Sequence, residues 1–438
     1  MNTQTTLPPR SVNLVLRCLA CLALLAGLGW VIPANHVMAG GGNYEAGEVI
    51  VQLAPLSGAT IEDIDRDHNT KTFQTFEPGS GIYLLQTPAG SDPEVSAKDL
   101  ALDPRLSFAE LNSIIHPPEA NSGGISRWGG LDPTPYPIQY AADQLNLAQA
   151  WNISRGAGTV VAVLDTGVQL DHPALASSIA PTGYDFIDND NIPQDTFNGT
   201  DSNGNGIVDE AAGHGTHVAG IIHLVAPDAK IMPLRVLDSD GNGDIFTLAQ
   251  AMIYAIQNHA NVINLSLGTP VQSNLIAKLV RAATRNNIVV VAAAGNLNSM
   301  APQYPAADNC VLSVTAVGPD GIKSDFANFG RVDFAASGES IYSTFPQDGY
   351  AYWSGTSMAA PFVAGQAALI HSARPRLNPR DLASLIGKTS HSLNALNPLY
   401  ARNLGMGLVD IGNSLMLSLN DDTESSENHG VIGESCVQ

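Results

Sequence analysis

The sequence of 438 residues is poor in charge, and in positive charge above all. Asp and Glu number 41 against 20 Lys and Arg, so the formal net charge is −21. Nucleic-acid binding needs a basic footprint, and anionic membrane surfaces also attract Lys and Arg. The composition therefore excludes broad binding of nucleic acid and argues against docking on anionic membranes. Hydrophobic residues make up 44% of the chain, which is enough to build a large core.

Long hydrophobic runs are missing from the chain except near its N-terminus. The first residues carry Arg10 and Arg17 without any acid, residues 18–32 are apolar, and Ala39 closes a motif of small residues. This pattern is typical of a secretory signal peptide over 1–39. A membrane anchor would need about 20 apolar residues. We therefore predict a secreted protein, extracellular or periplasmic, whose mature form does not enter a membrane.

Cysteine is also scarce, with four residues in the chain. Cys18 and Cys21 leave with the signal peptide, so the mature chain holds Cys310 and Cys436. Two cysteines do not make a disulfide framework. Because Cys436 lies in a polar segment, we expect two free thiols rather than a pair.

Residues 40–118 are predicted to form a small α+β unit. Strand patterns alternate with helix patterns, and Asp92 followed by Pro93 is a helix-start signal. The order strand–helix–strand–helix–strand indicates a ferredoxin-like unit. The predicted strands cover 47–53, 81–86 and 106–115, and the predicted helices cover 61–68 and 92–102.

The remainder divides into a linker, a large domain and a tail. Residues 119–138 are rich in Gly, Pro and Ser, which predicts a linker of the kind that proteases cut. Residues 139–418 alternate apolar runs with helical patterns, which predicts an α/β domain whose parallel sheet is covered on both faces by helices. Residues 419–438 are acidic, so we expect a disordered tail. The apolar runs are 160–164, 230–236, 262–267, 288–294 and 310–317, and the helical patterns are 248–260 and 274–286.

Three segments of the large domain carry chemistry. The first is an apolar run that ends in Asp165, followed by Thr166 and Gly167. Catalytic and ligand-binding sites in open α/β sheets lie at the carboxyl ends of strands. The alternative is an ordinary helix N-cap, because Asp commonly ends a strand in this way.

The second segment places His214 at the start of a helix of small residues. The spacing of His214 and His217 is compatible with zinc, but the His-Glu-x-x-His pattern of zinc peptidases is absent. We therefore expect His214 to be functional and His217 to be structural.

The third segment places Ser357 at a helix N-terminus, after Gly355. Pro361 is tolerated only near a helix start, which fixes that assignment. A backbone N–H and the positive end of the helix dipole can stabilise negative charge there. The alternative is a plain Ser N-cap.

Taken in order, Asp-Thr-Gly, His-Gly-Thr-His-Val-Ala-Gly and Gly-Thr-Ser-Met-Ala-Ala-Pro resemble the three motifs of the subtilisin-like serine proteases, the subtilases. The resemblance spans nearly all of 139–418. It implies that Ser357 attacks the scissile carbonyl, that His214 is the general base, and that Asp165 orients and stabilises the imidazole. It also implies that Asn296, which follows an apolar run, donates to the oxyanion together with the Ser357 N–H.

The same resemblance implies how substrate binds. A peptide would add as a strand to a backbone rail, since main-chain pairing gives affinity with little sequence demand. The residue before the scissile bond would lie between two walls. No residue of the pocket floor is identified, so the preference at this position stays open. The walls are Ser266, Leu267 and Gly268 on one side, and Ala293 to Gly295 on the other.

Residues 43–118 resemble the inhibitory propeptide of this family. The resemblance implies a unit that assists folding and blocks the cleft until the chain is cut between 117 and 140. The propeptide is thus an expected partner of the enzyme, beside its protein or peptide substrates. The alternative is a stable accessory domain.

A segment rich in Asp and Asn predicts a calcium site. Asp201, Asn203, Asn205 and Asp209 stand at the first, third, fifth and ninth positions of a calcium loop. Position twelve, where Glu is expected, is Ala212. The alternative is a solvated turn loop of the same composition.

Together these observations predict a secreted serine endopeptidase that acts through an acyl-enzyme and is made as a self-processed zymogen. Two alternatives keep the fold without the chemistry, namely a catalytically silent binding protein and a calcium-dependent adhesion protein. A nucleotide-binding function is excluded because Gly156 and Gly158 precede their strand, whereas a dinucleotide fingerprint follows one.

Overall fold

The N-terminal part of the chain folds into a β-α-β-β-α-β unit in the computed structural model, which describes residues 43–121, 128–300 and 303–420. All pairs in its sheet are antiparallel, in the order β2-β3-β1-β4. The elements are β1 (Tyr44–Leu53), α1 (Ile61–His68), β2 (Lys71–Thr75), β3 (Ile82–Gln86), α2 (Pro93–Leu100) and β4 (Leu106–Ile115). Strand β2 was not predicted, because its largely exposed residues lack an apolar alternation; it completes the ferredoxin-like order.

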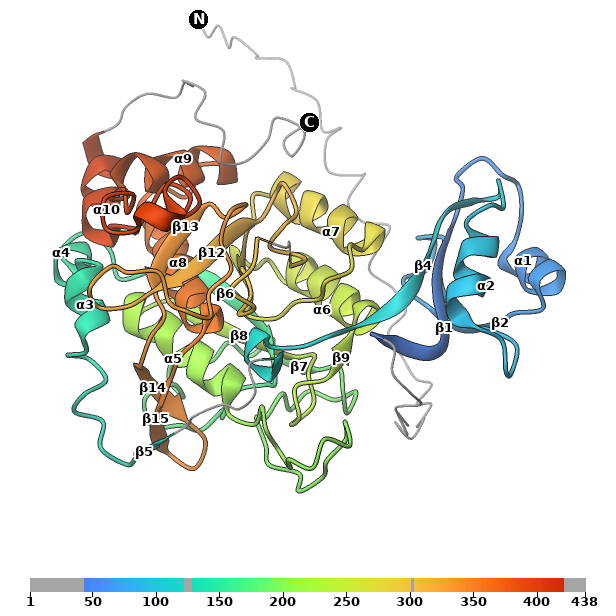
Figure 1. The fold of residues 1–438 in the computed structure, drawn as a ribbon, viewed down its shortest axis with the longest axis horizontal. Helices are drawn as coiled ribbons and strands as arrows, with labels where there is room; N and C mark the ends of the chain where they lie inside the picture. Colours follow the sequence, from blue (N-terminus) through green and yellow to red (C-terminus); the bar gives the residue numbers. More distant parts are fainter. Residues whose placement is uncertain (1–42, 122–127, 301–302, 421–438) are drawn as a thin grey trace, which may run out of the picture. The chain divides into compact units, whose positions relative to one another are not determined.

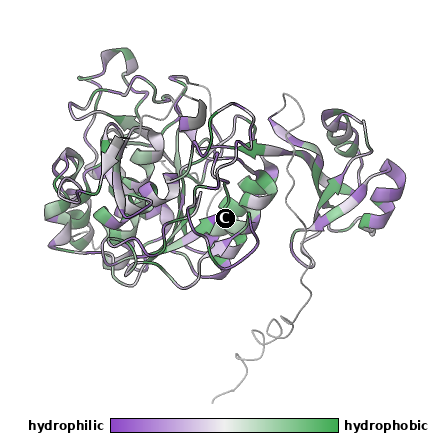
Figure 2. Ribbon diagram, turned by 90° about the horizontal axis from the view of Figure 1, so that it is seen from below, coloured by the Kyte–Doolittle hydropathy of each residue, from purple (hydrophilic) through white to green (hydrophobic). Residues whose placement is uncertain are grey.

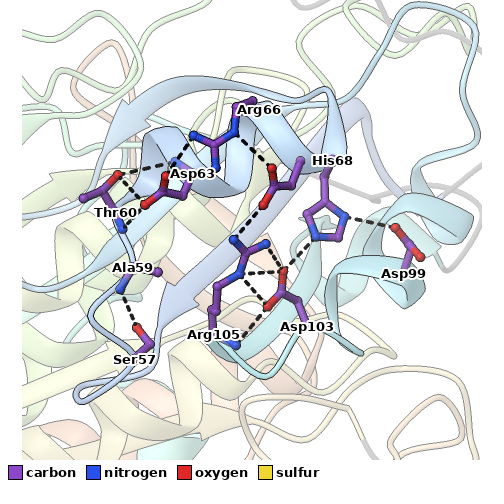
Figure 3. Close-up of polar contacts among 10 residues, drawn as sticks. Ser57, Ala59, Thr60, Asp63, Arg66, His68, Asp99, Asp103 and Arg105 are labelled. Atoms are coloured by element: carbon purple, nitrogen blue, oxygen red, sulfur yellow. Dashed lines mark hydrogen bonds and ion pairs between the residues drawn. The ribbon is translucent and has the colours of Figure 1, made fainter.

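Local sequence explains where the helices of this unit begin. The Thr60 side chain accepts from the Asp63 N–H and the Asp63 carboxylate accepts from the Thr60 N–H, which forms a capping box. Helix α2 begins at Pro93, after the Asp92 cap. Figure 3 shows that α1, the end of α2 and the segment between α2 and β4 are further joined by a network of polar side chains. The network pairs Arg66 with Asp63 and Asp67, Arg105 with Asp67 and Asp103, and His68 with Asp99 and Asp103.

The two faces of the N-terminal sheet enter different cores. Val49 and Val51 pack under α1 and α2 in a small separate core, whereas Ile50 between them belongs to the large core of the chain. This division follows from the period of two in a strand. On the face of Ile50, the ring of Phe76 meets Phe246 edge to face at 5.6 Å. The unit therefore covers its second face by packing against the large domain.

The large domain is built on a seven-stranded parallel sheet in the order β13-β12-β11-β10-β6-β8-β7. Helices α5 and α8 pack on each other against one face, and α6 and α7 pair on the other (Figure 1). The prediction of a parallel sheet covered on both faces by helices is confirmed. The strands are β6 (Val160–Asp165), β7 (Tyr184–Asp185), β8 (Lys230–Arg235), β10 (Val262–Leu265), β11 (Val289–Ala293), β12 (Leu312–Val317) and β13 (Phe334–Ser337). The helices are α5 (His214–Val225), α6 (Ile245–Gln257), α7 (Asn274–Arg285) and α8 (Thr356–Ala373).

Strands β10, β6, β8 and β11 are buried along their whole length apart from Val160 and Lys230 at two strand starts. Their residues are mainly apolar because helices cover both faces, and Figure 2 shows hydrophobic colour on elements inside the domain. Smaller elements complete the chain. They are η1 (Pro118–Asn121), β5 (Trp128–Gly130), α3 (Tyr140–Gln144), α4 (Leu147–Trp151), β9 (Gly243–Asp244), β14 (Ile341–Phe345), β15 (Gly349–Trp353), α9 (Pro379–Thr389), η2 (Pro398–Tyr400) and α10 (Ile411–Asn420).

Two predictions concern the linker and the membrane. Part of the segment predicted as a linker is structured, since β5 pairs with β15. The signal peptide over 1–39 and the tail beyond 420 lie outside the described residues. In the three described ranges, every helix is too short or too polar to span a bilayer.

The expectation of two free thiols is wrong. Cys310 is disulfide-bonded, and every other cysteine of the sequence lies outside the described residues.

Candidate active site

Strand β6 delivers Asp165 to the centre of the carboxyl edge of the sheet. Strands β8 and β10 pair with β6 on its two sides, so the chain order reverses here, where open α/β sheets place their sites. Asp165 is fully buried, and its Oδ1 accepts from His214 Nδ1 at 2.7 Å and from the Thr166 N–H at 2.8 Å. The carboxylate is thus aimed at the imidazole.

His214 is the first residue of α5, and the glycine after it lets the helix approach β6. A Cβ on Gly215 would collide with the Gly167 carbonyl oxygen and lie 3.1 Å from Asp165 Cβ. The Gly215 N–H donates to Thr166 Oγ1 at 2.9 Å. The segments that follow Asp165 and His214 in the sequence are therefore in direct contact.

Asp195 is a second buried carboxylate at this helix start, and no sequence pattern pointed to it. It accepts from the Gly213 N–H at 2.9 Å, the Thr216 N–H at 3.1 Å and Thr216 Oγ1 at 2.7 Å. Burial raises the pKa of Asp195 to about 6, although these hydrogen bonds lower it. Asp195 therefore takes the place of an N-cap side chain, which Gly213 lacks.

His217 has the structural surroundings expected for it. Its Nε2 lies 3.1 Å from the Ile341 carbonyl oxygen and 3.0 Å from that of Ala351, and burial lowers its pKa to about 3. It is therefore a neutral imidazole that ties α5 to the β14–β15 hairpin. Trp353 packs edge to face on both His214 and His217.

Ser357 is the second residue of α8, in the first turn, where backbone N–H groups lack helical partners. Pro361 lies four residues later and has no N–H, so the Ser357 carbonyl loses its helical donor. Ser266 Oγ donates to that carbonyl instead, at 3.0 Å. The Ser266 hydroxyl therefore links the predicted substrate-binding backbone to the first turn of α8.

Asn296 follows β11 with its amide held in one orientation. Its Oδ1 accepts from the Thr356 N–H at 3.0 Å and from Thr356 Oγ1 at 2.9 Å. The Nδ2 group is therefore left free of Thr356 and donates to a carboxylate that also accepts from Ser357, that of Glu119.

A carboxylate from the predicted linker lies among these groups. Glu119 Oε2 accepts from Ser357 Oγ at 2.7 Å and lies 3.4 Å from His214 Nε2, and its Oε1 accepts from Asn296 Nδ2 at 2.9 Å. Glu119 is 2% exposed. Burial opposes a proton on His214, but the carboxylates of Asp165 and Glu119 outweigh it and raise the pKa of His214 to about 10.

The chain reaches Glu119 by running through the predicted cleft as a strand. The His116 N–H donates to the Gly268 carbonyl at 3.0 Å, and the Gly268 N–H donates back to the His116 carbonyl at 2.8 Å. On the other side, Ile115 pairs antiparallel with Gly243. The end of the N-terminal unit therefore lies between two backbone partners, in the way expected of a bound peptide.

The two predicted walls face a common side chain, Gln303, that the sequence did not suggest. A Cβ on Gly268 would collide with the Gln303 amide, and so would a Cβ on Gly295. Gln303 Nε2 also lies 3.4 Å from the Ala293 carbonyl oxygen. The half-buried amide of Gln303 is thus beside both walls.

The residues predicted to bind calcium do not form an oxygen cage. Asn203 and Asn205 turn their amide nitrogens toward Glu210, and the Asp201 carboxylate accepts from backbone N–H groups of the loop. Asp209 accepts from the N–H groups of residues 198 and 199 instead. Across the described ranges, no three His, Cys, Asp or Glu side chains are arranged to hold a metal ion. These contacts therefore give no support to a calcium site in this loop.

Comparisons with known proteins agree with this geometry. Residues 156–407 match the model of the subtilase family, and residues 33–112 match that of the fervidolysin N-terminal prodomain. Thermitase from Thermoactinomyces vulgaris is 42% identical over 245 residues, which cover 53% of this chain and 82% of thermitase. A thermophilic serine proteinase from Bacillus sp. (strain AK1) is 34% identical over 76% of this chain and 79% of its own length.

A solved structure supports the fold. The crystal structure of fervidolysin from Fervidobacterium pennivorans, a keratinolytic enzyme related to subtilisin, matches with a TM-score of 0.69 and 24% identity. The match covers 86% of this chain and 62% of that one. Of the two family models, the one that matches the N-terminal part of the chain is that of a prodomain. The chain therefore belongs to the subtilase family of serine endopeptidases, with a prodomain before its catalytic domain.

Proposed function

We propose that the chain is the precursor of a secreted endopeptidase in which Ser357, His214, Asp165 and Asn296 perform the chemistry. The proposed boundaries are a signal peptide over 1–39, a propeptide over 40–118, a linker over 119–138 and a catalytic domain over 139–418. The observation that carries the proposal is the 2.7 Å hydrogen bond from His214 to Asp165, with Glu119 Oε2 spanning from His214 Nε2 to Ser357 Oγ.

In the proposed reaction, Ser357 Oγ attacks the carbonyl carbon of the scissile peptide and gives its proton to His214 Nε2. Asp165 holds the other ring nitrogen and stabilises the imidazolium. The new oxyanion accepts from Asn296 Nδ2 and the Ser357 N–H. Its collapse breaks the C–N bond, and His214 protonates the leaving amine, which leaves an acyl-enzyme. Water then attacks that ester with His214 as base, and the carboxylic product departs while Ser357 regains its proton.

Covalent labelling tests this assignment. A fluorophosphonate should label the wild-type matured enzyme, and Ser357→Ala should abolish the label. Ser354→Ala is a matched control, because Ser354 is exposed and accepts from the Ser340 N–H, away from the imidazole. A matured wild-type enzyme without label would overturn the proposed chemistry and leave a silent protein on the same fold.

Self-processing is part of the proposal. Support comes from the position of residues 115–119, whose backbone pairs with Gly268 and Gly243 in the predicted cleft and whose Glu119 side chain reaches Ser357. Ser357→Ala should therefore accumulate as the full precursor in a host without other proteases. Complete processing of that variant would refute self-cleavage. N-terminal sequencing of the exported active form would locate the point at which the propeptide is removed.

Calcium binding by the 201–209 loop stays a prediction of the sequence, and the loop's internal hydrogen bonds give it no support. If the loop binds calcium, a chelator should lower the melting temperature of the matured enzyme. An unchanged melting curve would remove the prediction, and no step of the proposed reaction depends on it.

A further inference from the structure

We propose that Asp195 is a positioning residue for His214, and that its negative charge supports the protonated imidazole that forms during the reaction. The inference rests on the proposed function, because it takes His214 to be the general base. Asp195 does not touch the reacting groups. It acts through the backbone at the start of α5, the helix whose first residue is His214.

The carboxylate of Asp195 holds the backbone on both sides of His214. One oxygen accepts from the Gly213 N–H at 2.9 Å. The other accepts from the Thr216 N–H at 3.1 Å and from Thr216 Oγ1 at 2.7 Å. Gly213 directly precedes the base and Thr216 lies two residues after it. The three hydrogen bonds therefore fix the turn of backbone that carries the imidazole.

The same residue ties this turn to the segment that follows Asp165. The Asp195 N–H donates to the Val168 carbonyl at 3.3 Å. The Thr216 hydroxyl, which donates to Asp195, also accepts from the Gln169 N–H at 2.9 Å. Asp195 is therefore bonded to both of the segments that must bring the carboxylate and the imidazole of the proposed triad together.

The charge of Asp195 matters because His214 stands at a helix N-terminus. That end of a helix carries a partial positive charge, which disfavours a protonated imidazole. The first turn of α5 has no acidic residue of its own to offset this charge. Asp195 supplies a negative charge from outside the helix. Removal of that charge should therefore lower the pKa of His214.

Asp195 itself is ionised at neutral pH. Burial and the neighbouring Asp165 carboxylate raise its pKa to about 6, against the hydrogen bonds that lower it. The support for the imidazolium should therefore be present above about pH 6 and fade as Asp195 gains a proton below it.

Several other titratable groups face the same turn or its neighbours. Because the wild-type enzyme and the variants described next share these groups, a difference between the enzymes reports the effect of Asp195. The groups are Asp165, Glu119 and His217 around the imidazole, Asp209 in the loop before α5, and Asp171 and Asp348 beside the Gln169 amide.

The test measures kcat and kcat/KM of the matured enzyme on one peptide substrate as a function of pH. Asp195→Asn removes the charge but keeps an acceptor for part of the cap, whereas Asp195→Ala removes both. In both variants the acid limb of kcat/KM should move to lower pH by about 0.5–1 unit, the size of a helix-end charge effect.

The plateau of the same profiles reports the positioning role. Asp195→Ala should lower kcat by about tenfold or more, because a small displacement of a catalytic group is costly. Asp195→Asn should lose less, since its amide oxygen can still accept from one of the backbone N–H groups. A residue that only stabilised the fold would leave the acid limb in place.

Asp410→Asn is the matched control. Asp410 is also a buried carboxylate at a helix start, where it accepts from the Asn413 N–H of α10 at 2.8 Å. Helix α10 carries none of the proposed catalytic residues. This variant should therefore lower the melting temperature without moving the acid limb.

Three results would overturn the role of Asp195. They are an acid limb that stays at the wild-type pH in both Asp195 variants, a wild-type kcat in Asp195→Ala, and an equal shift of the limb in Asp410→Asn. If the alanine variant does not fold, the acid limb of Asp195→Asn still decides. Absence of fluorophosphonate label in the matured wild-type enzyme would instead count against the proposed function.

Discussion

The N-terminal unit and the catalytic domain bury their apolar residues in different ways. The unit has a small core of its own, formed by Val49, Val51, Ile61, Ile64, Leu85, Ala97, Leu100 and Leu106. The catalytic domain has one continuous core that crosses its seven-stranded sheet. Small domains bury too little surface to be very stable alone. The comparison indicates that the N-terminal unit depends on the catalytic domain to bury its second face, whereas the catalytic domain buries its apolar residues in one continuous core.

The largest expected difference between the two regions is in how shortening one buried isoleucine of each core to alanine changes the stability of the matured enzyme. Ile64 and Ile386 are both fully buried, the first in the N-terminal unit and the second in α9. Ile386→Ala should destabilise the matured enzyme by about 2–5 kcal/mol, measured by thermal unfolding. Ile64→Ala should leave the melting temperature of the matured enzyme unchanged but lower the yield of active enzyme. A lowered melting temperature for matured Ile64→Ala would contradict the separation.

Loss of the oxyanion donor Asn296 should lower the activity of the catalytic domain and leave the N-terminal unit unaffected. Asn296→Ala should lower kcat by about 10²–10³-fold, the loss known for such a donor in subtilisin, with little change in KM. Thermal unfolding would verify that the variant is folded, and Asn286→Ala at the exposed end of α7 is the control. A kcat within a few-fold of wild type would remove Asn296 from the chemistry.

Removal of a single carboxylate, that of Glu110, should weaken the contact between the two regions. Glu110 of β4 accepts from Ser273 Oγ at 2.7 Å and from the N–H groups of Asn274 at 2.7 Å and Leu275 at 3.2 Å, at the start of α7. Glu110→Gln should weaken docking by about 1–3 kcal/mol. Unfolding of the N-terminal unit, measured in a Ser357→Ala background, would report the loss. No shift relative to Glu94→Gln, at an exposed position of α2, would show that the helix contact contributes nothing.

The smallest effect is expected on the outer surface of the N-terminal unit. The hydrogen bond from Arg105 is the main cause of the lowered pKa of Asp103, and the pair is part of the network in Figure 3. A lowered pKa stabilises the fold above the ordinary value of 3.8, and this contribution is lost as the pH falls below it. Arg105→Gln should therefore lower stability slightly at neutral pH, where this contribution is present, and should reduce the further loss of stability in acid. An acid unfolding profile identical to wild type would contradict this role.

The sequence predicted the parts of the fold and site whose signal is local. The strand that ends in Asp165, the helix that begins at His214 and the turn before Ser357 each carry their signal in a few adjacent residues. Because β6, β8 and β10 are buried on both faces, their apolar runs could be read directly. Strand β2 escaped prediction because its residues are mainly solvent-exposed.

The residues that the sequence did not suggest act through distant partners. Asp195 caps a helix whose N-cap residue, Gly213, lies 18 residues later. Glu119 meets Ser357 across 238 residues, and Gln303 faces glycines on two different segments. No local pattern records such contacts. Conversely, the spacing that favoured Asp209 as a calcium ligand could not tell that its carboxylate binds backbone N–H groups.

The most direct test compares how fast Ser357 is modified with and without the N-terminal unit attached. The uncleaved precursor and the matured enzyme would be treated with a fluorophosphonate under the same conditions, and the peptide that carries Ser357 would be examined by mass spectrometry. We expect rapid modification of Ser357 in the matured enzyme and slow modification in the precursor, where Glu119 occupies the site. Equal modification of both forms, or none of the matured enzyme, would contradict the account.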